Sequence, residues 1–143
     1  MAHFACHGIA NTRDPPLSQL KLYDWKTAPL DVRILSQHPY TGLQFVYLSA
    51  CESGVTKAPR FEEESVHISA AFQAAGVPYA VATLWSIEDR STVDIATSFY
   101  SRLAEGSEID FSRSAEALHY AVMQARNRGI DPLLWASFVH FGA

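Results

Sequence analysis

Residues 44–50 read QFVYLSA, and this stretch decides the fold of the chain. Its centre combines Phe45, Val46, Tyr47 and Leu48, a run of aromatic and branched apolar side chains that predicts a β-strand. A strand with one face in water alternates apolar and polar residues, but this run does not. We therefore expect a strand that is buried on both faces, as in a parallel sheet covered by helices.

Three further apolar segments predict strands of the same sheet, which gives four strands in all. They cover residues 1–7, 79–85 and 135–141. We expect the first segment to be buried and to end in His7. A short edge strand or hairpin arm is predicted by the spacing of Leu20, Leu22 and Trp25.

Four segments predict helices, which alternate with the strands along the chain. They cover residues 30–37, 62–75, 92–105 and 112–128. The third helix has an apolar face at helical spacing, formed by Val93, Ala96, Phe99, Tyr100 and Leu103. Residues 52–61 predict a long polar loop. Because strands and helices alternate and no linker divides the chain, we expect one α/β domain with a mainly parallel sheet.

The composition excludes several classes of protein. The chain has 143 residues, of which 48% are hydrophobic and 18% charged, so it is not a disordered chain. Its net charge of −4 and the lack of a basic stripe argue against a nucleic-acid partner. No apolar run reaches the ~18 residues of a membrane span, and no secretory signal opens the chain. We expect a cytoplasmic protein whose two cysteines stay reduced.

Two side chains suited to covalent catalysis stand at the ends of predicted strands, His7 in HFACHG and Cys51 in LSACESG. Ligands of open α/β sheets bind beyond the carboxyl ends of the strands, and neighbouring strands lie ~4.8 Å apart. A cysteine thiolate is a strong nucleophile, and a nearby imidazole can accept the thiol proton. Either residue alone is more commonly structural, but together they predict nucleophilic catalysis.

Metal binding is the rival chemistry, since His3, Cys6, His7 and Cys51 are all possible zinc ligands. In a continuous strand, alternation places His3 and His7 on one face and Cys6 on the other, so the three do not converge. The chain also lacks a CxxC pair. We therefore expect no metal and no cofactor, and we do not favour a disulfide between Cys6 and Cys51.

Five motifs together resemble the CHAT domain, a member of the caspase–separase clan of cysteine peptidases. They are HFACHG at 3–8, LSACESG at 48–54, AFQAAGVPYAVATLWSIED at 71–89, FYSRL at 99–103 and WASFVHFG at 135–142. The resemblance covers essentially the whole chain. The sequence departs from the caspase QAC box, because Ser49 replaces the glutamine and the glycine follows one residue later, at Gly54.

The resemblance implies a caspase-like three-layer fold and a His7–Cys51 dyad. His7 would act as the general base and Cys51 as the nucleophile, and the backbone N–H groups of Gly8 and Cys51 would form the oxyanion hole. Asp89 would shape the substrate pocket and favour a basic side chain, or it would cap the helix at 91–105. Glu52 would face the substrate or remain an exposed loop carboxylate.

The expected function is that of a cysteine endopeptidase that cleaves a protein or peptide substrate. The alternative is a catalytically silent CHAT domain that acts in signalling or scaffolding through protein–protein contacts. The resemblance also implies that residues 1–143 form the C-terminal portion of a larger caspase-like unit that has further N-terminal strands. Expected partners are those N-terminal strands or an upstream TPR-like repeat region. We then expect the outer edge of the first strand to be unpaired.

Overall fold

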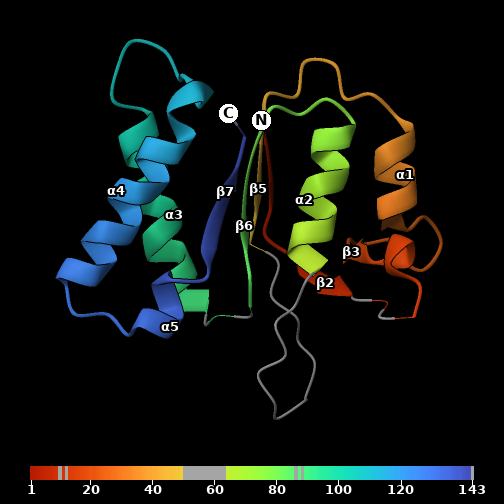
Figure 1. The fold of residues 1–143 in the computed structure, drawn as a ribbon, viewed down its shortest axis with the longest axis horizontal. Helices are drawn as coiled ribbons and strands as arrows, with labels where there is room; N and C mark the ends of the chain where they lie inside the picture. Colours follow the sequence, from red (N-terminus) through yellow and green to blue (C-terminus); the bar gives the residue numbers. More distant parts are fainter. Residues whose placement is uncertain (10, 12, 50–63, 86, 88, 143) are drawn as a thin grey trace.

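A four-stranded sheet separates two layers of helices in the computed structural model, which describes residues 1–9, 11, 13–49, 64–85, 87 and 89–142 (Figure 1). The strand order is β1 (Ala2–Phe4), β5 (Phe45–Leu48), β6 (Tyr79–Thr83) and β7 (Phe138–Phe141). The β1–β5 and β5–β6 pairs are parallel, whereas β6 and β7 are antiparallel. The prediction of a mainly parallel α/β sheet is confirmed, and the last strand is its one antiparallel member among the described residues.

The central strand β5 is buried on both faces, as its sequence predicts. Phe45 and Tyr47 belong to one hydrophobic core, whereas Val46 and Leu48 belong to the core on the opposite face of the sheet. Alternate side chains of a strand point to opposite faces, so four consecutive apolar residues supply both cores. This arrangement explains why the strand shows no alternation of apolar and polar residues.

Helices cover both faces of this sheet (Figure 1). One face packs against α3 (Asp89–Leu103) and α4 (Ser114–Asn127). The other face is covered by α1 (Val32–Gln37) and α2 (Glu64–Ala74). Two shorter helices, η2 (Phe111–Arg113) and α5 (Pro132–Trp135), flank α4 in the chain.

The buried faces of α3 and α4 share one spacing. Each presents side chains at positions i, i+1, i+4 and i+8, which lie on one side of a helix. They are Ile95, Ala96, Phe99 and Leu103 in α3, and Ala117, Leu118, Ala121 and Ala125 in α4. The prediction that Val93 belongs to the buried face is wrong, because its side chain is 61% exposed.

Local signals explain how two of the helices begin or end. The carboxylate of Asp31 accepts a hydrogen bond from the N–H of Ile34 at 2.9 Å, so Asp31 caps the start of α1. Gly76 follows the end of α2 with φ = +92°, a conformation that glycine adopts readily and other residues avoid.

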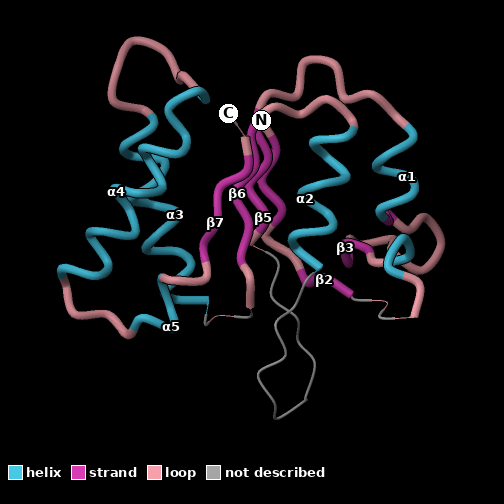
Figure 2. Tube along the Cα trace, in the orientation of Figure 1, coloured by secondary structure: helices cyan, strands magenta, loops and turns pink. Residues whose placement is uncertain are grey.

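A second, smaller sheet was not expected in this form. It contains β2 (His7–Ile9), β3 (Gln19–Lys21) and β4 (Leu30–Asp31), all antiparallel, and the short helix η1 (Pro15–Leu17) lies between β2 and β3 in the chain. Figure 2 shows β2 and β3 beyond the lower end of the central sheet, near the start of α2. The predicted edge strand or hairpin arm at Leu20, Leu22 and Trp25 is right in part: only Leu20 lies in a strand, and that strand, β3, is the middle one of this sheet. The described residues hold seven strands, and the predicted number of four applies to the central sheet alone.

The prediction that residues 1–7 form one strand ending in His7 is wrong. The β1–β5 register ends at the pair Phe4 and Leu48, and the N–H of Ser49 donates to the carbonyl of Phe4 at 3.2 Å. The chain then leaves the central sheet, and β2 pairs with β3. The outer edge of β1 has no neighbouring strand among the described residues. Within the same residues, no helix is long and apolar enough to cross a membrane.

Candidate functional site

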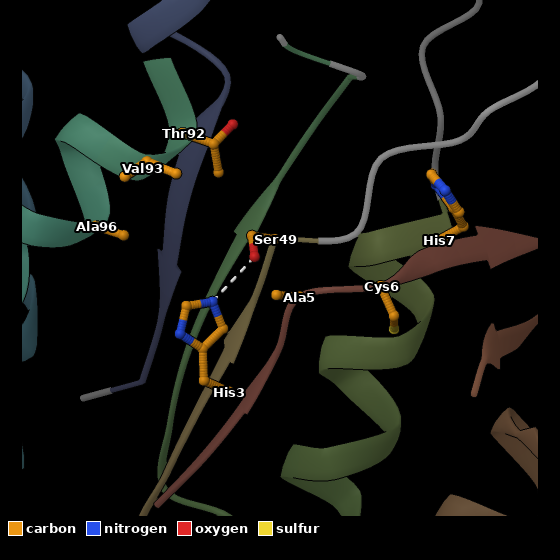
Figure 3. Close-up of a pocket in the computed structure, with 8 residues that line it drawn as sticks. All are labelled: His3, Ala5, Cys6, His7, Ser49, Thr92, Val93 and Ala96. Atoms are coloured by element: carbon orange, nitrogen blue, oxygen red, sulfur yellow. Dashed lines mark hydrogen bonds between the residues drawn. The ribbon is translucent and has the colours of Figure 1, made fainter. Parts of the chain in front are cut away.

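A pocket of about 440 Å³ lies where the parallel strands β1 and β5 end. The chain enters β1 at the top of Figure 1, so the carboxyl ends of these strands point down toward β2. The lining comes from β1 and the residues after it, the end of β5, the start of β2 and the first turns of α3 (Figure 3). It consists of His3, Ala5, Cys6, His7, Ser49, Thr92, Val93 and Ala96. Ligands of open α/β sheets bind at this edge.

His7 lies at this pocket, although it does not end a strand of the central sheet. It is the first residue of β2, where it pairs with Lys21, and it is exposed. Figure 3 places it on the side of the pocket away from His3. The adjacent Gly8 is buried and pairs with Leu20.

Several predicted site residues lie outside the part of the chain that the structure describes. They are Cys51, Glu52 and the loop predicted at 52–61. Ser49, the last described residue before Cys51, follows β5 and lines the pocket. The structure thus brings His7 and the strand that leads to Cys51 to the same pocket.

Asp89 is the first residue of α3, and its side chain lies outside the described part. The helix therefore begins three residues before the helix predicted at 92–105, and two before the bound of 91 used for the capping alternative, and Asp89 stands in its first turn. An acidic residue in a first turn is favoured by the positive end of the helix dipole. The next residues of the same helix, Thr92 and Val93, line the pocket.

A hydrogen-bonded group on one wall of the pocket joins three elements. His3 Nε2 lies 2.9 Å from Ser49 Oγ, the contact that Figure 3 marks with a dashed line. On the other side of the ring, His3 Nδ1 lies 3.1 Å from the hydroxyl of Tyr100 in α3. The imidazole also packs against the Tyr47 ring, with centroids 4.7 Å apart. Both ring nitrogens of His3 therefore have a partner.

This hydrogen-bonded group is uncharged at neutral pH. Burial lowers the pKa of His3 below its ordinary value of 6.5, because the charged imidazolium loses contact with water. Burial also raises the pKa of Tyr100 to about 12. The part of the pocket wall formed by His3 and Ser49 is therefore polar but neutral, and Tyr100 contacts it through His3.

Cys6 has the environment of a structural thiol. It is half-buried, packs against the core beneath α2, and has its pKa raised by that burial. Its side chain and that of His7 point in opposite directions (Figure 3). A raised thiol pKa leaves little of the reactive thiolate at neutral pH.

The strand-alternation argument against zinc does not apply as stated, because His3 and His7 belong to different sheets and Cys6 lies between them. Within the described residues, no group of three or more His, Cys, Asp or Glu side chains could hold a metal ion.

Sequence reasoning missed the group of His3, Ser49 and Tyr100. The side of the sheet on which His3 lies was predictable from the sequence. Alternation within β1 places His3 on the face opposite Ala2 and Phe4, which pack toward α2. The approach of Tyr100 depends on how α3 crosses the sheet, and no local pattern encodes that crossing.

Comparisons with known proteins bear on the whole chain. The family model described as the CHAT domain matches residues 1–143. A search of curated proteins found no match.

Proposed function

This chain belongs to the CHAT-domain family, and from that premise we propose that it is a cysteine endopeptidase in which His7 and Cys51 form the catalytic dyad. The CHAT domain is a caspase-like, peptidase-related domain. One observation carries the proposal: His7 lines a pocket at the carboxyl ends of β1 and β5, and Cys51 stands two residues after the pocket residue Ser49. Two elements distant in sequence thus converge where a substrate can bind.

In the proposed reaction, His7 accepts the proton of the Cys51 thiol, and the thiolate attacks the carbonyl carbon of the scissile peptide bond. The backbone N–H groups of Gly8 and Cys51 stabilise the negative charge that develops on the carbonyl oxygen. The C–N bond then breaks, and His7 gives its proton to the departing amine. Water attacks the remaining thioester, which releases the carboxylic acid and restores the thiol.

Asp89 and Glu52 are the proposed substrate-binding residues. Asp89 would favour a basic side chain before the scissile bond, and Glu52 would face the substrate. The position of Asp89 supports its part of this proposal. It begins the helix whose following residues, Thr92 and Val93, line the pocket.

The test is covalent labelling by a peptide that carries a thiol-reactive electrophile and a basic residue next to it. We expect labelling at Cys51 that is lost in Cys51→Ala and falls at least about a hundredfold in His7→Ala. Cys6→Ala is the matched control, because it removes the other cysteine, and it should keep full labelling. Equal labelling of the native protein, Cys51→Ala and His7→Ala would overturn the proposal.

A further inference from the structure

The group formed by His3, Ser49 and Tyr100 has no part in the dyad chemistry, yet two of its members, His3 and Ser49, line the same pocket. It draws one residue from β1, one from the end of β5 and one from α3. A hydrogen-bonded group that spans three elements fixes their relative positions more firmly than a contact within one element.

The contacts of Ser49 favour one direction for its hydrogen bonds. Ser49 Oγ lies 3.5 Å from the carbonyl oxygen of Phe4, a weak contact that is longer than the roughly 2.5–3.0 Å of an ordinary O–H···O hydrogen bond. With the Ser49 hydroxyl donating to Phe4, the Nε2–H of His3 donates to Ser49 Oγ, and the Tyr100 hydroxyl donates to His3 Nδ1. Every donor of the group then has an acceptor.

Ser49 is held through its backbone as well as its side chain. Its N–H donates to the Phe4 carbonyl at 3.2 Å, which continues the β1–β5 pairing by one residue. The His3 imidazole also packs against the rings of both Tyr47 and Tyr100, at centroid distances of 4.7 and 5.7 Å. The chain is therefore firmly anchored two residues before Cys51.

We propose that His3 and Ser49, supported by Tyr100, position the Cys51 thiolate for attack on the substrate carbonyl; this inference rests on the proposed dyad. Attack requires the sulfur to approach the carbonyl carbon in a narrow range of geometries, and a misplacement of about 1 Å can lower the rate about a hundredfold. His3 is a positioning residue and not a second base, because both of its ring nitrogens are engaged.

The chain offers a matched control on another surface. His140 Nε2 in β7 lies 2.8 Å from Ser114 Oγ in α4, so the same two residue types form the same kind of hydrogen bond. Burial lowers the pKa of His140 as it does that of His3. Neither His140 nor Ser114 lines the pocket.

The experiment compares two reagents on Cys51, with the modified residue identified by mass spectrometry. Iodoacetamide is small and reports the thiolate itself, whereas the peptide electrophile also needs the sulfur in position for attack. In Ser49→Ala we expect the maximal rate with the peptide reagent to fall about tenfold, with its half-saturating concentration unchanged. The iodoacetamide rate should stay within about twofold of the native rate.

Substitutions at His3 separate its two contacts. Glutamine places its terminal amide where Nε2 lies and can still donate to Ser49, so His3→Gln should keep most of the peptide-reagent rate. Asparagine reaches only the Nδ1 position and cannot donate to Ser49. The peptide-reagent rate of His3→Asn should therefore fall roughly tenfold, as in Ser49→Ala. Tyr100→Phe removes the hydroxyl that bonds to His3, and its peptide-reagent rate should fall about threefold. The control variants Ser114→Ala and His140→Asn should react like the native protein with both reagents.

The outcomes separate this inference from the proposed function. Native peptide-reagent rates in both Ser49→Ala and His3→Asn would overturn the positioning role, and so would an equal fall with both reagents. If Ser49→Ala folds poorly, iodoacetamide reacts faster because the thiol is exposed. Tyr100→Phe and His3→Asn then decide, and native peptide-reagent rates in both of them would overturn the positioning role. If Cys51→Ala and His7→Ala do not lower peptide labelling, the dyad itself is wrong, whatever the His3 variants do.

Discussion

Replacing Tyr47 by phenylalanine should stabilise the protein, whereas the same change at Tyr100 should destabilise it. Tyr47 is 0% exposed, and its hydroxyl has no hydrogen-bond partner among the described residues. Burial raises the pKa of this phenol, and the neighbouring Tyr100 adds to that effect. An unpaired buried hydroxyl costs about 1–3 kcal/mol, so its removal should raise the free energy of unfolding by about 1 kcal/mol.

The Tyr100 hydroxyl, in contrast, bonds to His3 Nδ1 at 3.1 Å. Its removal should lower the free energy of unfolding by about 0.5–1.5 kcal/mol. The rings of Tyr47 and Tyr100 lie only 5.6 Å apart, so each variant loses one hydroxyl in nearly the same surroundings. The two variants should therefore differ by about 2 kcal/mol, with opposite signs relative to the native protein.

Urea unfolding followed by tryptophan fluorescence measures this difference. The dependence of free energy on urea should be unchanged in both variants, because neither alters the surface exposed on unfolding. A Tyr47→Phe variant that loses about 1 kcal/mol or more would show that its hydroxyl has a stabilising partner, which would refute the reasoning.

Three further predictions concern stability. Phe99→Ala should lower the free energy of unfolding by about 3–5 kcal/mol in urea unfolding, because this fully buried ring packs against Phe45 at 5.5 Å; a loss below about 1 kcal/mol would contradict that packing. Asp31→Ala should lower the free energy of unfolding by about 1–2 kcal/mol in the same measurement, because it removes the α1 cap. Asp31→Asn keeps a capping side chain and should lower the free energy of unfolding clearly less. Acidification below about pH 6.5 should destabilise the fold. The pKa values of His3 and His140 are lowered in the folded protein, so the unfolded chain binds protons first as the pH falls. The contribution of these two histidines to stability is therefore complete above about pH 6.5 and decreases below it. The double variant His3→Gln/His140→Gln should show a weaker pH dependence of its unfolding midpoint, and an unchanged one would count against both pKa shifts.

The central strand and the helices were predictable because their apolar spacing is local. β5 needs apolar side chains on both faces, and Phe45 to Leu48 supply them. The antiparallel direction of β7 was not predictable, since strands of either direction share the same period of two. The bend between β1 and β2 was also not predictable, because residues 1–7 contain no glycine or proline to mark it. The last pair of the β1–β5 register is Phe4 with Leu48, and this pairing joins residues far apart in the sequence, so no local pattern marks where it ends.

The candidate site was predictable in part. The resemblance assigned His7, and the structure places it at the pocket, although on a strand of the small sheet. The hydrogen bonds of His3 to Ser49 and Tyr100 could not be inferred, because they join residues far apart in the sequence. The position of Val93 was not predictable for a related reason: its spacing fits a buried face, but it lines the pocket and is exposed.

The measurement that tests the central claim most directly is the rate of Cys51 alkylation by iodoacetamide as a function of pH, in the native protein and in His7→Ala. If His7 and Cys51 form a dyad, the native thiol should react with an apparent pKa below the value of about 8.5 for a free cysteine, and His7→Ala should return it to that value. Cys6, alkylated in the same samples, should not respond to the substitution. Identical profiles for Cys51 in the two proteins would contradict the dyad.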